Sequence, residues 1–113
     1  MMRIYHNPRC RKSRETLKLI TDSGVEPEIV EYLITPPSQE ELTEIIGKLG
    51  ISPPALLRKS EGIFKEKFKG NTFTGAEWIK IMVKHPKLIE RPIVVKGDKA
   101  IIGRPPENIL PLL

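Results

Sequence analysis

The chain has one cysteine, two histidines and few aromatic side chains, and it has no long apolar run. A single cysteine excludes an internal disulfide bond, and with so few histidines we expect no protein metal site. No apolar stretch approaches the length of a membrane span, and the first residues lack the apolar stretch of a signal peptide. We therefore expect a cytoplasmic protein, in a reducing compartment, with no membrane and no metal.

What the chain does have is enough apolar material for a core and an excess of positive charge. At 113 residues with 39% hydrophobic residues, it is expected to form a single domain, residues 1–113. Its net charge of +5 favours anionic partners. The charge is dispersed and aromatic residues are few, so we expect no nucleic acid partner. A small oxyanion or an acidic thiol such as glutathione fits better.

The pattern of apolar residues predicts a three-layer α/β domain. Predicted strands cover residues 2–5, 28–33, 93–95 and 99–102, and the last two form a hairpin. Helices are predicted at residues 11–23, after the capping pairs Ser38/Glu41 and Thr74/Glu77, in a short turn at 55–58, and after Pro105. Residues 65–71 are predicted to be an exposed loop. A strand–helix–strand start implies a parallel pair, and the hairpin adds antiparallel strands to a mixed sheet.

Cys10 stands between the first predicted strand and the first predicted helix, among Arg9, Arg11, Lys12 and Arg14. The unpaired N–H groups of a helix start and nearby cations both lower a thiol pKa, and the thiolate is the reactive form. The alternative is that Cys10 is a small buried apolar residue, as many free cysteines are.

The same surroundings are typical of an oxyanion site with a nucleophile inside it. Ser13 lies three residues after Cys10, where its hydroxyl can donate a hydrogen bond to the sulfur. Because a serine stands where a redox motif would carry a second cysteine, an adduct on Cys10 must be resolved by an outside thiol.

Other polar residues are open to two interpretations. His6 either orients and acidifies the neighbourhood of Cys10 or is a structural hydrogen-bonding residue. Arg58, Arg91 and Arg104 are either solvated or bind an oxyanion through their fork of donors. The step from Arg91 to Pro92, at the start of a strand, is a candidate cis peptide bond.

Several motifs in a fixed order extend over nearly the whole chain. They are HNPRCRKSRETL at 6–17, EYLITPP at 31–37, LLRK at 56–59, HPKLIERPIVV at 85–95 and IGRPPE at 102–107. In these motifs the chain resembles the ArsC family, the glutaredoxin-coupled arsenate reductases with a thioredoxin-like fold.

The resemblance implies a four-stranded mixed sheet with an inserted helical part at about 36–84, and a cis proline at Pro92. It implies that Cys10 attacks arsenate, that glutathione then adds, and that glutaredoxin reduces the product to release arsenite. Supporting roles are implied for the residues that match the family's motifs: His6 and Ser13 for the thiolate, and Arg58, Arg91 and Arg104 for the oxyanion. No bound cofactor is implied, glutathione being a co-substrate, and we expect a monomer.

One departure from the family pattern is Arg11-Lys12 after the cysteine, where dedicated arsenate reductases usually have Gly-Thr. This pair resembles an ArsC-like housekeeping branch and leaves the substrate open. A glutathione-linked thiol exchanger is one alternative function. Another is a regulator resembling Spx that binds RNA polymerase, which the missing second cysteine disfavours.

Overall fold

The computed structural model describes all 113 residues, which divide into two compact units. The first unit combines Met1–Thr35 with Arg91–Leu113, and the second is Pro36–Glu90. Each unit is described by itself. None of the helices combines the length and the apolar character that crossing a membrane requires.

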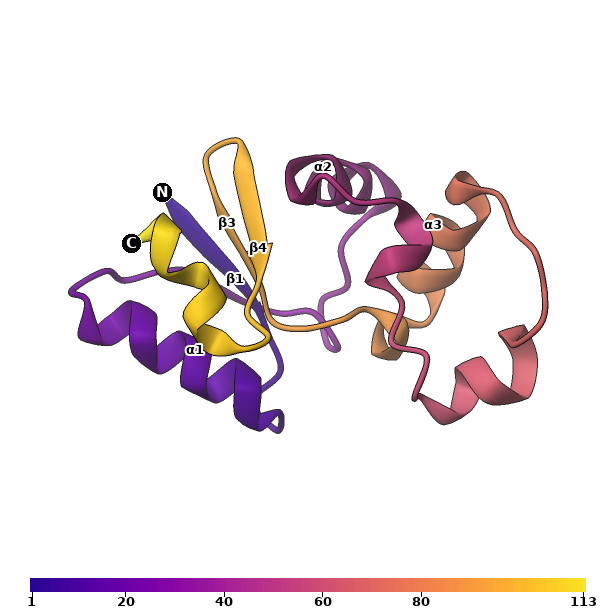
Figure 1. Cartoon of the computed structure of the whole chain (residues 1–113), viewed down its shortest axis with the longest axis horizontal. Coiled ribbons are helices and arrows are strands. Elements are labelled where there is room, and N and C mark those ends of the chain that lie inside the picture. The colour runs from indigo at the N-terminus through magenta and orange to yellow at the C-terminus, as the bar shows by residue number, and fades with distance from the viewer. The chain divides into compact units, whose positions relative to one another are not determined.

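The first unit is built on a four-stranded mixed sheet with the strand order β2-β1-β3-β4 (Figure 1). Strand β1 pairs in parallel with β2, while the β1–β3 and β3–β4 pairs are antiparallel. The strands are β1 Met2–His6, β2 Glu28–Glu31, β3 Ile93–Lys96 and β4 Lys99–Ile102. The α/β class and the four-stranded mixed sheet predicted from the sequence are confirmed.

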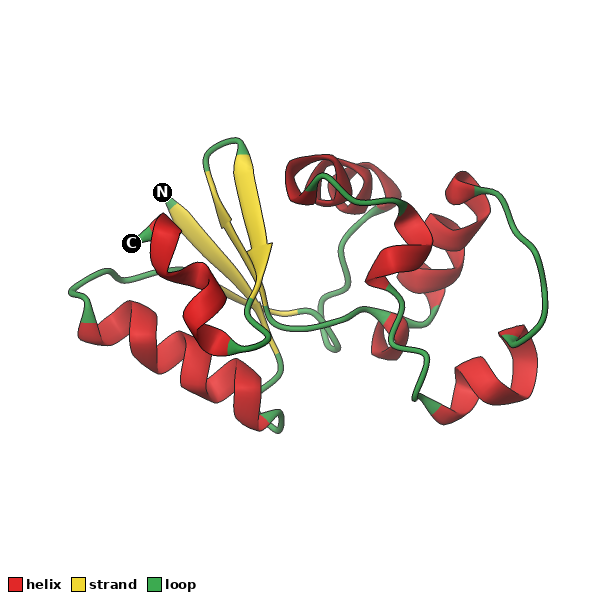
Figure 2. Ribbon diagram, in the orientation of Figure 1, coloured by secondary structure: helices red, strands yellow, loops and turns green.

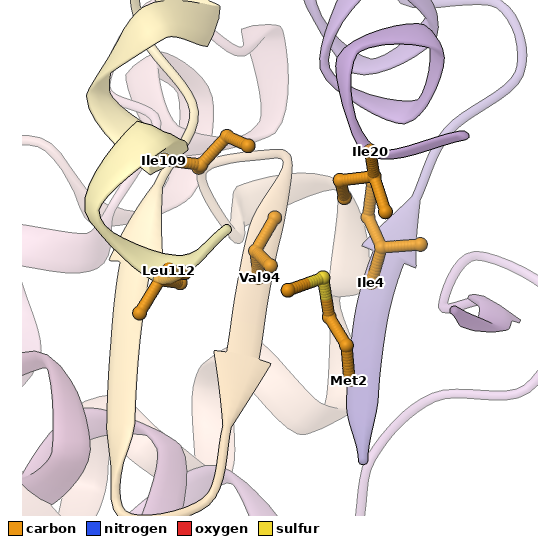
Figure 3. Close-up of a cluster of buried hydrophobic side chains, with 6 residues drawn as sticks. All are labelled: Met2, Ile4, Ile20, Val94, Ile109 and Leu112. Atoms are coloured by element: carbon orange, nitrogen blue, oxygen red, sulfur yellow. The ribbon is translucent and has the colours of Figure 1, made fainter. Parts of the chain in front are cut away.

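Two helices pack on one face of this sheet: α1, Arg11–Asp22, and the 3₁₀ helix η4, Pro106–Leu112. Figure 3 shows how the two helices and the strands contribute to one apolar cluster. Its members are Met2 and Ile4 of β1, Ile20 of α1, Val94 of β3, and Ile109 and Leu112 of η4. Each such side chain contributes about 1.5–3 kcal/mol when fully buried. This cluster fixes α1, and therefore the start of α1, against β1.

The backbone of this unit has two cis peptide bonds. One joins Arg91 and Pro92, the candidate cis bond named from the sequence, and the other joins Arg104 and Pro105. The hairpin between β3 and β4 turns at Gly97, whose φ of 61° is in the left-handed region that glycine adopts without strain.

The second unit is helical, as the ribbon coloured by secondary structure shows (Figure 2). It contains α2 Gln39–Leu49, the 3₁₀ helix η1 Pro53–Leu56, the π-helix η2 Phe64–Phe68, α3 Gly75–Lys84 and the 3₁₀ helix η3 Pro86–Leu88. The Ser38 side chain accepts the N–H of Glu41 at the start of α2, and Thr74 with Glu77 forms a complete capping box at α3.

The prediction of an exposed loop at residues 65–71 is wrong for its first part, because residues 64–68 form η2. This turn brings Phe64 and Phe68 against the buried Trp78 of α3, with ring centroids 6.3 Å apart in both pairs. The aromatic contacts join η2 to a different helix, α3, so the local basic composition of residues 65–71 did not indicate them. The predicted terminal helix is present as the 3₁₀ helix η4.

Candidate active site around Cys10

Cys10 is the N-cap residue of α1, with an extended backbone at φ −91° and ψ 121°. A turn after β1 brings it there: the N–H of Cys10 donates to the carbonyl of Asn7 (3.0 Å), and the Asn7 side-chain oxygen accepts the N–H of Arg9 (3.0 Å). The Cys10 carbonyl accepts the N–H of Arg14 (3.0 Å), which begins the helix. The thiol is half-buried at the start of the helix, where the sequence predicts it.

The electrostatic surroundings lower the pKa of the Cys10 thiol below its ordinary value. Burial alone would raise it, because burial penalises the charged thiolate. This effect is outweighed by the backbone N–H of Ser13, by the hydrogen bond and charge of Arg91, and by the backbone N–H of Lys12. The helix-start amides act on the sulfur as the sequence predicts, whereas the cation that lowers the pKa is Arg91 rather than the charged side chain of one of the four basic residues next to Cys10.

Arg104 also reaches the sulfur, from a segment far along the chain. Its Nη1 donates to the Cys10 Sγ at 3.7 Å and to the carbonyl oxygen of Arg91 at 3.3 Å. Two of the three arginines named from the sequence, Arg91 and Arg104, thus act on Cys10. A thiolate that accepts hydrogen bonds from two guanidinium groups is a nucleophile placed where an oxyanion would also bind.

Ser13 differs in one respect from the sequence prediction. Its buried hydroxyl lies 2.6 Å from the Nδ1 of His6 and accepts the N–H of Asn7 at 3.0 Å, so the hydroxyl faces β1 rather than the sulfur. What Ser13 offers the sulfur is its backbone N–H. Helix geometry explains the difference, because the Ser13 side chain points toward the buried side of α1.

His6 is buried at the end of β1, beside this hydroxyl. Burial lowers the pKa of the His6 ring, the charge of Glu31 raises it, and the charge of Arg14 lowers it, with a net lowering. His6 is therefore mainly neutral at neutral pH. Its ring bonds to the Ser13 side chain, so His6 helps to fix the start of α1.

The four basic residues next to Cys10 differ in what they contact. Arg11 is exposed and pairs with Glu15 one turn along α1 (3.0 Å), and the exposed Arg14 donates to the carbonyl of Pro8 (3.0 Å). Lys12 acts on the sulfur through its backbone N–H. The departure at Arg11-Lys12 therefore leaves the backbone support of the thiolate in place.

Arg58 belongs to the second unit, so its role in the site stays a prediction. It follows η1, its backbone N–H donates to the carbonyl of Leu88 (2.7 Å), and its side chain pairs with Glu61 (3.6 Å). Its buried Nη1 has no hydrogen-bond partner.

Sequence reasoning missed three residues that shape the site. Asn7 holds the turn before Cys10, and Thr16 bonds to Gly103, which directly precedes Arg104. For Asn7 a signal was present, since Asn-Pro is typical of a turn start. No group of three or more His, Cys, Asp and Glu side chains is placed to hold a metal ion.

The chain is similar to known proteins over nearly its whole length. The model of the ArsC family matches residues 5–112. The chain is 47% identical over 114 residues to the uncharacterized protein YfgD of Escherichia coli (strain K12), covering 99% of this chain and 96% of that protein. It is 46% identical over 112 residues to an arsenate reductase of Haemophilus influenzae, covering 97% of each. The solved structure of an arsenate reductase from Vibrio cholerae matches with a TM-score of 0.95 at 45% identity, covering 99% of this chain and 97% of that one.

Proposed function

This chain belongs to the ArsC family and has its thioredoxin-like fold, and we propose that it is an arsenate reductase-like thiol oxidoreductase. The observation that carries the proposal is the setting of Cys10. Its sulfur lies at the N-terminus of α1, has a lowered pKa, and accepts a hydrogen bond from Arg104 at 3.7 Å. Relatives named arsenate reductase, 46% identical to this chain, support the choice of substrate.

In the proposed reaction the Cys10 thiolate attacks the arsenic of arsenate. A sulfur–arsenic bond forms, and one arsenate oxygen leaves as water after protonation. The guanidinium groups of Arg91 and Arg104 neutralise the remaining oxygens, since an anionic nucleophile would otherwise be repelled by an anionic substrate.

Two further thiols complete the reaction, because Cys10 is the only cysteine of the chain. Glutathione forms a second sulfur–arsenic bond and releases another water. A glutaredoxin thiolate then attacks the glutathione sulfur, giving a mixed disulfide and leaving the electron pair on arsenic, which becomes As(III). Hydrolysis of the remaining bond releases arsenite and restores the Cys10 thiolate. Glutathione is thus a co-substrate and glutaredoxin a partner, with no bound cofactor.

The proposal extends to residues that match the family's motifs. His6 and Ser13 hold the start of α1 and so support the thiolate, and Arg58 is the third oxyanion-binding arginine. We assign residues 1–113 to a single ArsC-like domain, with about 36–84 as its helical insertion. A thiol that must stay reduced to react fits the cytoplasm.

The test is NADPH consumption in an assay that couples arsenate, glutathione, glutaredoxin and glutathione reductase. The wild-type chain is expected to turn over arsenate, and Cys10→Ser is expected to show no turnover above background because a serine hydroxyl is not ionised at neutral pH. Full activity of Cys10→Ser would exclude this mechanism.

A glutathione-linked thiol exchanger remains the second candidate. The exposed cations Arg9, Arg11 and Arg14 near Cys10 favour it, since glutathione carries two carboxylates that such side chains bind. Reduction of a glutathionylated peptide by a chain that leaves arsenate unreduced would select this alternative.

A further inference from the structure

Gly103, which directly precedes Arg104, lies against helix α1 with almost no free space. It is buried, its N–H donates to the carbonyl of Pro92 (2.9 Å), and its own carbonyl accepts the hydroxyl of Thr16 (3.4 Å). Thr16 is fully buried on α1, and its hydroxyl also donates to the carbonyl of Lys12 (2.8 Å). The segment carrying Arg104 is therefore in direct contact with the helix whose N-cap is Cys10.

A side chain at Gly103 would not fit. A Cβ there would stand 2.6 Å from the Thr16 Oγ1, 3.0 Å from the Thr16 Cγ2 and 3.0 Å from the Pro92 Cγ. Thr16 is stiff because it is β-branched, and the Pro92 ring is rigid, so neither gives way easily. The backbone at Gly103 would have to move away from α1 instead.

Such a movement would act on Arg104 first. Arg104 is an exposed side chain whose own backbone is held by its N–H to the Ile102 carbonyl (2.9 Å) and by the Asn108 amide on the Arg104 carbonyl (3.1 Å). At 3.7 Å, its bond to the Cys10 sulfur has little tolerance for a shift of an ångström.

We propose that the contact between Gly103 and Thr16 is a positioning device that sets the distance between the Arg104 guanidinium and the Cys10 sulfur. Thr16 and Gly103 bond to each other, to Lys12 and to Pro92, and they act on the sulfur through Arg104. This inference deepens the proposed function and rests on it for the oxyanion.

The test compares Gly103→Ala with Gly47→Ala, a matched control on the exposed side of α2 where a Cβ meets nothing within 4 Å. Two properties are measured: the KM and kcat for arsenate, and the protection by arsenate of Cys10 against iodoacetamide alkylation. For Gly103→Ala we expect KM to rise about tenfold, as for a weakened hydrogen bond to a charged group, with weaker protection. Gly47→Ala should match the wild type in both.

Two double variants separate positioning from general damage. Adding Thr16→Ala to Gly103→Ala removes both close Thr16 atoms. KM should then return most of the way to the wild-type value. Adding Gly103→Ala to Arg104→Ala should change nothing further, because the side chain to be positioned is already gone. A Gly103→Ala variant with wild-type KM and protection would overturn the inference, and so would an equal effect of Gly103→Ala with and without Arg104.

A substitute variant and a substitute measurement cover two ways in which the first experiment can fail. If Gly103→Ala does not fold, Thr16→Val replaces it, since it keeps the volume and removes the hydroxyl that bonds Gly103. For Thr16→Val a smaller rise in KM is expected. An unchanged KM would count against a positioning role of the contact between Gly103 and Thr16. If the wild type does not reduce arsenate, the proposed function fails, while the pH profile of Cys10 alkylation in the same variants still decides whether Gly103 acts through Arg104.

Discussion

The two units of the chain differ in what fills them and in what chemistry they carry. The apolar cluster of the first unit has no aromatic member, and the buried aromatic residues of that unit are Tyr5 and Tyr32. The only tryptophan and all three phenylalanines are in the second unit. There, Trp78 contacts Phe64, Phe68 and Phe73, the last with ring centroids 4.8 Å apart. Cys10 and the two arginines that act on it are all in the first unit.

The difference between the two units shows which parts of the structure place Cys10 and its two arginines. Cys10 is the N-cap of α1, Arg91 lies just before β3 begins, and Arg104 lies just after β4 ends. The reactive groups are therefore held by backbone geometry at the ends of strands and helices. The second unit is held by side-chain packing, in which the aromatic cluster around Trp78 joins buried aliphatic residues such as Leu42 and Leu56. Substitutions should accordingly separate into those that change stability and those that change the thiol.

The largest stability effect is expected for Trp78→Ala, which should lower the free energy of unfolding by about 3–5 kcal/mol. The substitution removes a buried ring that packs on three others. Urea denaturation measures the change, with Trp78→Phe as a milder control. The pH profile of Cys10 alkylation should stay as in the wild type. A shifted profile would mean that the contrast between the units is false.

Arg91→Ala should have the opposite pattern, with a small stability change and a large effect on the thiol. Removing its hydrogen bond and charge raises the pKa of Cys10, so less thiolate is present at neutral pH. We expect arsenate kcat/KM to fall roughly ten- to hundredfold. The alkylation rate against pH checks the thiol directly. Arg91→Lys keeps the charge without the fork and should lie in between, and an unshifted profile for Arg91→Ala would contradict the assignment.

Thr74→Ala removes the capping box of α3 and should cost about 1 kcal/mol of stability. Ser38→Ala, at the N-cap of α2, is the matched change in the same unit, and Thr74→Ser is the conservative control. Thermal and urea unfolding give the differences. Neither alanine variant should change the KM for arsenate. A raised KM in either variant would mean that the second unit contributes to substrate binding.

The smallest effect is expected from the histidines, of which each unit has one. Burial lowers the pKa of both His6 and His85 below 6.5. The unfolded chain therefore binds more protons below about pH 6.5, so folding stability should fall as the pH drops through this range. NMR titration of the two rings should give midpoints below 6.5 in each case. A midpoint above that value for His6 would mean that His6 does not contribute to the loss of folding stability at low pH.

Much of the fold and of the Cys10 site could be predicted from the sequence, because helix caps and strands depend on residues that are neighbours in the chain. The strands, the N-cap at Cys10 and the Thr74/Glu77 box follow from local patterns. The π-helix η2 was missed because its phenylalanines, Phe64 and Phe68, pack on Trp78 in a later helix. The contact of Thr16 with Gly103 joins residues 87 positions apart, which no local pattern indicates. The oxyanion-binding role of Arg58 was predicted from the sequence and stays a prediction.

Strand β2 has a consequence for crowded solutions. It is an edge of the sheet, four residues long, with Glu28 and Glu31 at its ends and Ile29 half exposed between them. A second copy pairing antiparallel along this edge would bring Glu28 opposite Glu31, and parallel pairing would align each glutamate with its own equivalent. Like charges facing each other destabilise a strand pair. The acidic ends therefore protect an otherwise apolar edge against aggregation, and neutralising both would remove that protection.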